Sequence, residues 1–190
     1  LKTMRRGKEV RKLNAGWLFA PKYVENKLKF CGIIKEAVAF GDHKDFVSCF
    51  INIDLEAVAS WAERNNIAYS GYIDLAGQSS VYDLISKEID KVNEDLAEDL
   101  ELNDSQIKRF LILHKELDAD DGELTRTNKV RRNLISERYG KLVDALYSNE
   151  DHCFIETEVT FEDGRKGSIS ADLKIQDMKI IDLKDKVAWV

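Results

Sequence analysis

The sequence has little of several features that would place it in a specialised class. It contains one proline and three cysteines in 190 residues. Cys31, Cys49 and Cys153 stand singly among apolar residues without a CxxC pair, so the sequence indicates neither a zinc site nor a disulfide framework. We interpret all three as core thiols of a reducing compartment.

Long apolar runs and a surplus of positive charge are also missing. No stretch approaches the roughly 20 apolar residues of a transmembrane helix, and no signal-peptide pattern opens the chain. The net charge of −6 argues against general nucleic-acid binding. The content of 44% hydrophobic and 34% charged residues is typical of a soluble globular protein. We expect a cytoplasmic location, with peripheral attachment to a membrane left open.

What is present is an alternation of helix and strand patterns. Pro21 opens an apolar stripe at helical spacing, Asp54 suits the N-cap of a second helix, and the helix after Lys129 is amphipathic. The expected helices span residues 21–30, 55–65, 80–100 and 129–146. The expected strands span residues 33–40, 46–53 and 109–114, and the first two should pair as antiparallel neighbours across a Gly-Asp turn.

The two ends of the chain differ from this alternation. The basic stretch from Arg5 to Lys12 predicts a short hairpin around Gly7, which residues 14–16 should end. Since the chain begins inside such a stretch, we expect it to be part of a longer protein. Near the other end, apolar and polar residues alternate over 154–161 and again over 168–175, with an Asp-Gly turn between them. This pattern predicts a β-hairpin that lies with one face against the rest of the domain.

One segment indicates chemistry. Residues 122–132 read GELTRTNKVRR and place Lys129 after a polar loop, where an ammonium can reach a phosphate. The segment resembles the C-terminal motif Gly-x-Leu-Thr-x-Thr-x-Lys-x-x-Arg of the AMP-forming acyl-CoA synthetases, especially their long-chain fatty-acid branch. Thr125, Thr127, Lys129 and Arg132 occupy the matching positions, while Arg126 stands where that branch commonly has proline. Without the resemblance, the same residues read as a solvated helix start, where the helix dipole disfavours cations.

Further segments resemble the same branch in the same order. They are GWLFAPKYVE at 16–25, KEAVAFGDHKDFVSCFI at 35–51, and the stretches 61–67, 89–96 and 107–113. The resemblance, which covers roughly residues 2–139, implies the small C-terminal lid of a two-domain enzyme. We therefore expect an α+β fold, a small mixed sheet with packed helices and an appended β-hairpin. The expected divisions are a hinge with a basic hairpin at 1–13, the lid at 14–147 and the extension at 148–190.

The resemblance also implies roles for individual residues. Lys129 would be the catalytic lysine of adenylation, Gly16 and Trp17 the CoA side of the lid, and Lys2 the hinge. By the same resemblance, ATP, CoA and Mg would be bound mainly by an N-terminal domain that also holds the fatty acid. No glycine-rich phosphate loop occurs in this sequence. The full protein would be an acid–thiol ligase, and this chain alone would be inactive.

Several alternatives remain open from the sequence. Trp17 is equally a loop anchor against Tyr23, and the cluster of Arg5, Arg6 and Lys8 is either a solvated hairpin or a contact for CoA phosphates. The acidic loop at 118–123 lacks the ligand spacing of a calcium loop, so we expect no metal there. The three histidines carry no pattern of a catalytic triad. The whole chain is also compatible with a ligase for another carboxylic acid or with a non-catalytic interaction module.

Overall fold

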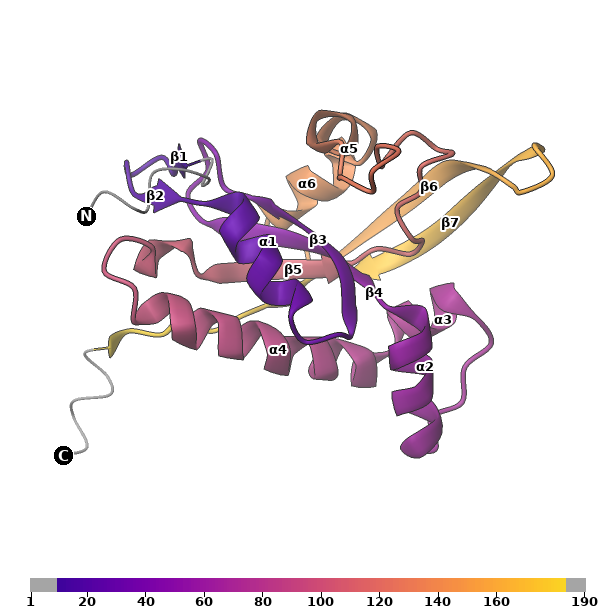
Figure 1. The fold of residues 1–190 in the computed structure, drawn as a ribbon, viewed down its shortest axis with the longest axis horizontal. Coiled ribbons are helices and arrows are strands. Elements are labelled where there is room, and N and C mark those ends of the chain that lie inside the picture. Colours follow the sequence, from indigo (N-terminus) through magenta and orange to yellow (C-terminus); the bar gives the residue numbers. More distant parts are fainter. Residues whose placement is uncertain (1–9, 184–190) are drawn as a thin grey trace.

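The computed structural model describes residues 10–183. A mixed four-stranded sheet, in the order β3-β4-β5-β8, forms the centre of the molecule (Figure 1). β3 (Ile34–Phe40) runs antiparallel to β4 (Val47–Ile53), which is parallel to β5 (Ile107–Ile112), and the short β8 (Gln176–Asp177) is antiparallel to β5. This is the α+β fold that we expected, with the first two strands paired as predicted.

Alternate residues of the central strands point to opposite faces and build two cores. Cys49 and Ile51 of β4 belong to the first core, which packs α1 (Pro21–Lys29) and α4 (Ser79–Ala97) against one face. Phe50 of β4 belongs to the second core, on the face with α5 (Arg132–Arg138) and α6 (Gly140–Leu146). The strand β4 is buried along its whole length because both of its faces are covered.

Local sequence signals account for most of the helices. Pro21 is the first residue of α1, and the carboxylate of Asp54 accepts the backbone N–H of Ala57 at 2.9 Å at the start of α2 (Leu55–Arg64). Both helices and the long α4 confirm the predicted pattern. The short α3 (Tyr72–Gly77) and the 3-10 turn η1 (Asn103–Ser105), which flank α4, were not expected.

The single helix expected from Lys129 to Leu146 is wrong. Lys129 lies in a loop, and two short helices, α5 and α6, follow it and meet at Tyr139. The side chain of Tyr139 is fully buried, and its hydroxyl donates to Glu123 at 2.5 Å. The helix is interrupted at Tyr139, whose side chain is held by burial and by this hydrogen bond. The next residue, Gly140, is a poor helix former, so the predicted helical pattern does not continue through this point.

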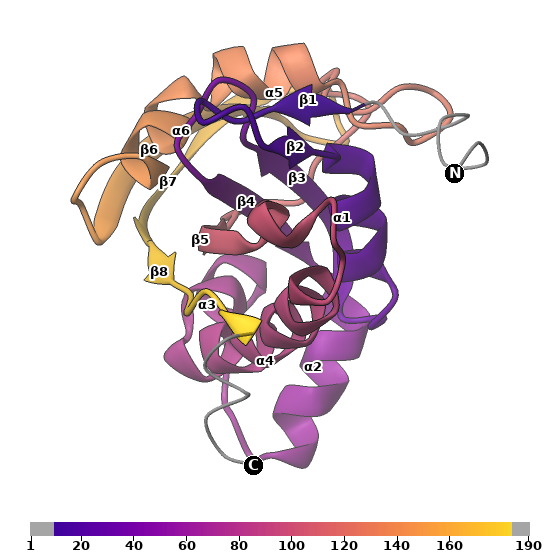
Figure 2. The ribbon, with the colours of Figure 1, turned by 90° about the vertical axis from the view of Figure 1, so that its left-hand side faces the viewer.

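The N-terminal hairpin also differs from the expectation. Residues 1–9, including Gly7, lie outside the described part of the chain. Within it, β1 (Arg11–Lys12) pairs with β2 (Leu18–Phe19), so residues 14–16 form the turn of a hairpin rather than its end. This hairpin lies near η1 and the end of the sheet (Figure 2).

The C-terminal extension contains the predicted hairpin. β6 (His152–Thr160) pairs with β7 (Lys166–Lys174), and buried and exposed residues alternate along β6. Cys153, Ile155 and Leu173 enter the second core, which confirms that the hairpin lies against the domain. The hairpin projects from the face that carries α5, and β8 then returns the chain to the central sheet (Figure 1).

Candidate functional site

Lys129 lies at the end of a tight turn in the loop between β5 and α5. We call residues 118–131 the lysine loop. The turn is closed by the backbone N–H of Thr125, which donates to the carbonyl oxygen of Lys129 at 2.8 Å, and by an isolated β-bridge between Leu124 and Val130. Asn128 adopts a positive φ of 56°, which asparagine tolerates better than most residues. The loop therefore has a defined backbone although it contains no helix or strand.

The two threonines of the motif take part in this turn. The hydroxyl of Thr125 accepts the backbone N–H of Lys129 at 3.0 Å and lies 3.1 Å from the hydroxyl of Thr127. Such hydroxyl-to-backbone bonds are a common way to fix a turn. The Thr-x-Thr-x-Lys spacing thus has a structural reason, because the first threonine holds the peptide unit of the lysine.

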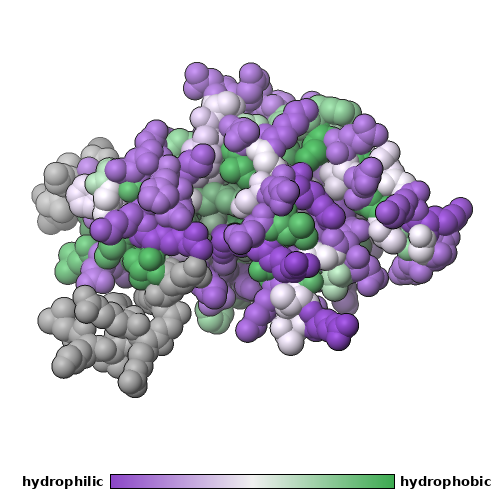
Figure 3. Space-filling model, turned by 90° about the horizontal axis from the view of Figure 1, so that it is seen from above, coloured by the Kyte–Doolittle hydropathy of each residue, from purple (hydrophilic) through white to green (hydrophobic). Residues whose placement is uncertain are grey.

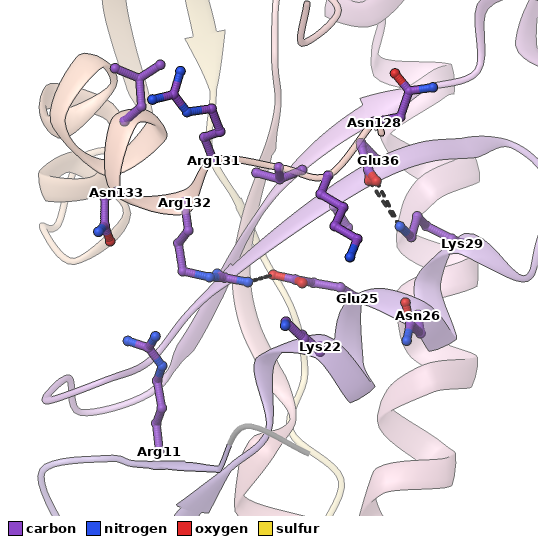
Figure 4. A pocket seen from close by; sticks show the side chains of 14 residues that line it. Arg11, Lys22, Glu25, Asn26, Lys29, Glu36, Asn128, Arg131, Arg132 and Asn133 are labelled. Carbon is purple, nitrogen blue, oxygen red and sulfur yellow. Dashed lines mark hydrogen bonds and ion pairs between the residues drawn. The ribbon is translucent and has the colours of Figure 1, made fainter. Parts of the chain in front are cut away.

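The lysine loop forms one side of a groove of about 650 Å³ (Figure 4). Six basic and two acidic residues line it, and both acids are paired. Glu36 accepts from Lys29 at 2.8 Å, and Glu25 pairs with Arg132. Lys129 is exposed, and its hydrogen bonds within residues 10–183 involve only its backbone. The basic residues of the groove are Arg11, Lys22, Lys29, Lys129, Arg131 and Arg132.

Arg132 of the motif belongs to the floor of the groove. Its guanidinium donates to the carbonyl oxygen of Ala39 at 2.6 Å and to the carboxylate of Glu25, which itself accepts the N–H of Ala39 at 2.8 Å. Figure 4 shows its side chain pointing toward Glu25. Burial raises the pKa of Glu25, although the charge of Arg132 opposes that shift. Arg132 thus joins the start of α5 to α1 and β3.

Glu123 is the residue of the site that sequence reasoning missed. It is fully buried, and its carboxylate accepts hydrogen bonds from Lys115 at 2.7 Å, Arg138 at 3.0 Å and Tyr139 at 2.5 Å. It also accepts the backbone N–H of Asp118 at 3.0 Å. A glutamate in a polar loop gives no sign of burial, and its position in the motif was the only available signal. Four donors around one buried carboxylate anchor the lysine loop to the domain.

The predicted CoA-side residues lie in the β1–β2 turn, residues 13–17, which we call the glycine turn. Gly16 has a φ of 84°, and a Cβ added there would meet no atom within 4 Å. Trp17 is 56% exposed. This side chain lines a second hollow together with Phe46 and the C-terminal segment 180–183, whereas Lys129 lines the first. Within residues 10–183, Lys129 and Trp17 thus line two different hollows.

Lys2, Arg5, Arg6 and Lys8 lie outside the described residues. Cys49 and Cys153 are buried and Cys31 is half-buried, all three as free thiols. In residues 10–183 we find neither a group of three potential metal-binding side chains nor a helix with the length and apolarity to cross a membrane.

A profile described as AMP-binding enzyme C-terminal domain matches residues 12–151. The long-chain-fatty-acid–CoA ligase FadD15 of Mycobacterium tuberculosis is 31% identical over 146 residues, which are 76% of this chain and 24% of that protein. The peroxisomal long chain acyl-CoA synthetase 7 of Arabidopsis thaliana is 24% identical over 150 residues, 78% of this chain and 21% of that protein. The chain thus spans about a quarter or less of these relatives.

Solved structures show the same fold. The A-PCP didomain of the carboxylic acid reductase from Segniliparus rugosus, in complex with AMP, superposes with a TM-score of 0.53 at 18% identity. The match covers 74% of this chain and 17% of that one. The adenylation domain of a carboxylate reductase from Mycobacterium chelonae gives a TM-score of 0.53 at 19% identity, over 73% of this chain and 19% of that one.

Proposed function

The chain belongs to the family of AMP-binding enzyme C-terminal domains, and we propose that it is the lid of an ATP-dependent long-chain fatty-acid–CoA ligase. The observation that carries this proposal is the position of Lys129. Its ammonium is exposed on a preformed turn, above a groove whose two acidic residues are already paired. An unneutralised cation in such a place suits a ligand that brings negative charge.

In the first half-reaction, the fatty-acid carboxylate attacks the α-phosphate of ATP, and pyrophosphate leaves. Two anions must approach each other, and negative charge increases around phosphorus in the transition state. Lys129 would lie between the carboxylate and the α-phosphate and offset the repulsion. A charge placed in this way is typically worth a few kcal/mol, about a hundred- to a thousandfold in rate.

The preformed turn supports this role. Because Thr125 fixes the peptide unit of Lys129, only the four-carbon side chain has to be ordered when the substrate binds. The ATP- and acyl-binding pockets would belong to an N-terminal domain outside this chain. That domain would also bind Mg²⁺, which supplies further neutralisation of the phosphates, and the chain alone would not turn over substrate.

In the second half-reaction, the thiol of CoA attacks the acyl adenylate, and AMP leaves. Lys129 would obstruct this step if it stayed over the phosphate, so we propose that the lid rotates and presents the glycine turn instead. Gly16 would allow close backbone approach of the pantetheine arm, and the exposed Trp17 would form a wall beside it. Lys129 and Trp17 line different hollows. This separation supports the proposal that the lid uses one face for adenylation and another for thioester formation.

The relatives favour fatty acids over other carboxylic acids as substrates. Both relatives described above are named long-chain ligases or synthetases, whereas the carboxylic acid reductases share the fold at under 20% identity. Chain-length specificity would be set by the acyl pocket of the N-terminal domain. A binding module without catalysis would have no need for an exposed lysine on a fixed turn.

The test is the substitution Lys129→Ala in the full-length protein, with the two half-reactions measured separately. Acyl-adenylate formation, followed by release of pyrophosphate, should fall on the order of a hundredfold or more. Thioester formation from supplied acyl adenylate should be nearly unchanged. Arg126→Ala is the matched control, because it removes an exposed cation from the same loop. If adenylation in Lys129→Ala stays within a few-fold of the native rate, the proposed function is wrong.

A further inference from the structure

The C-terminal hairpin contacts the lysine loop through a hydrogen bond. The carboxylate of Asp121, in the lysine loop, accepts the backbone N–H of Thr160 at 3.1 Å. Thr160 is the last residue of β6. A second polar contact of β6 lies three residues earlier, where the hydroxyl of Thr157 is 3.0 Å from Nε2 of the buried His114, just before the lysine loop.

The side chain of Asp121 is nearly buried, unlike that of Asp120. It is 6% exposed and forms an ion pair with Lys115 at 3.1 Å, whereas Asp120 is exposed. Lys115 also binds Glu123, so the two loop carboxylates share one buried ammonium. Burial by itself would raise the pKa of Asp121, but Lys115 and the N–H of Thr160 lower it. The carboxylate is therefore held ionised between the hairpin and the loop.

The hairpin lies beyond the part of the chain that matches the family. The family profile ends at residue 151, and β6 begins at His152. Hydrophilic residues dominate the face that carries α5 (Figure 3), and the N–H of Thr160 adds a polar contact between the hairpin and the lysine loop. The contact at Thr160 is a feature that the extension adds to the family's domain.

We propose that this hairpin positions the lysine loop for adenylation, with Asp121 as the positioning residue that links them. The role rests on the proposed function, in which Lys129 must reach one phosphate. Asp121 does not touch substrate and acts through the loop backbone. Glu123 ties the loop to Arg138 and Tyr139, and Asp121 ties it to the hairpin. A loop with both ties has fewer conformations to lose when substrate binds, which favours the transition state.

Hydrogen exchange in the 190-residue chain tests the link without any reaction. The reporters are the backbone N–H groups of Thr125, Asn128, Lys129 and Arg131, all of which donate hydrogen bonds within the loop. Asp121→Ala should speed their exchange on the order of fivefold to tenfold, as expected for the loss of one or two hydrogen bonds. Asp120→Ala removes the same charge next to it and should have no effect.

A second variant removes the link from the hairpin side. Phe161 and Arg165 are hydrogen-bonded across the hairpin, so Thr160 and Glu158 occupy positions whose N–H groups point away from β7. Thr160→Pro deletes the donor to Asp121 without removing a bond of the ladder, and Glu158→Pro is the matched control. Exchange in the loop should rise in Thr160→Pro only, while the amides of α4 keep their protection. Asp121→Asn retains an acceptor for Thr160 and should restore part of the protection.

Measuring the two half-reactions distinguishes a positioning role of Asp121 from a purely structural one. In the full-length protein, Asp121→Ala should slow adenylation several-fold and leave thioester formation from acyl adenylate unchanged. Unchanged loop exchange in both Asp121→Ala and Thr160→Pro would overturn the link itself. Faster exchange with an unchanged adenylation rate would overturn the positioning role. The exchange result stands even if Lys129→Ala disproves the proposed function, so the two failures are distinguishable.

Discussion

The lysine loop and the glycine turn are both short connections, but they are held in different ways. The lysine loop is anchored by the buried carboxylate of Glu123, with its four donors, and by Asp121. In the glycine turn, Leu13 donates to Trp17 at 3.0 Å and Gly16 to Leu13 at 2.9 Å, both through the backbone, and Trp17 remains exposed. Under the proposed function, the charge of Lys129 has to meet one phosphate and therefore needs a fixed support. The glycine turn would instead contact the flexible arm of CoA, which requires accessible backbone and an exposed ring.

The largest expected difference between the two regions is in how much each contributes to the free energy of unfolding. In the lysine loop this contribution comes mainly from Glu123. Glu123→Ala in the 190-residue chain should lower the free energy of unfolding by about 3–5 kcal/mol, because it removes the carboxylate that binds Arg138 and the hydroxyl of Tyr139 and leaves Lys115 with Asp121 as its remaining acidic partner. Urea unfolding measures the change. Glu137→Ala, at an exposed position of α5, should change it by less than about 0.5 kcal/mol. A loss below about 1 kcal/mol in Glu123→Ala would show that the anchor is not energetically important.

A second expected effect is the pH dependence that His114 gives to the region beneath the lysine loop. His114 is 1% exposed and its Nδ1 has no partner in the described part of the chain. Burial, with the charge of Lys115, lowers its pKa from 6.5 to about 4. Between these values the unfolded chain binds the proton and the folded chain does not. The stabilisation that comes from the neutral, buried His114 should therefore be fully present above about pH 6.5. The free energy of unfolding should fall by about 3 kcal/mol as the pH drops to about 4.

The measurement for His114 is a series of urea transitions between pH 7 and pH 4. His114→Gln should remove most of the slope between pH 6.5 and 4, even if it lowers stability at pH 7. His43→Gln should keep the slope, because the side chain of His43 is 85% exposed. An equal slope in the native chain and in His114→Gln would assign the acid sensitivity to the carboxylates instead.

The smallest expected effect lies in the glycine turn. Gly16→Ala should cost only about 1 kcal/mol, because the φ of 84° strains an L residue while the added Cβ meets no atom within 4 Å. Gly77→Ala is the control, since Gly77 has equally open space without a positive φ and should be neutral or slightly stabilising. In the full-length protein, the larger Gly16→Leu should slow thioester formation more than adenylation. Equal losses in both half-reactions would leave Gly16 with a purely structural role.

Much of the fold could be read from local patterns. Pro21 and Asp54 mark helix starts because their effects on the backbone reach only a few residues, and the two-residue alternation over β6 reports one buried face. The motif around Lys129 identified the candidate site and the family by resemblance. The roles of Lys129, Gly16 and Trp17 remain predictions, and the position of Lys2 lies outside the described residues.

Tertiary structure decided what local patterns do not contain. The sequence by itself determined the helices α1, α2 and α4, the pairing of β3 with β4, the alternating strands of the C-terminal hairpin and the position of the lysine motif. Only the folded chain placed Arg132 beside Glu25, 107 residues away. It also brought the buried Glu123 and Tyr139 together, at the point where the expected helix is interrupted. A charged residue is buried only where distant donors converge on it, and that convergence depends on how the sheet, the helices and the hairpin pack. The sequence thus specified which residues carry charge, and the packing determined which of those charges are buried and paired and which stay exposed.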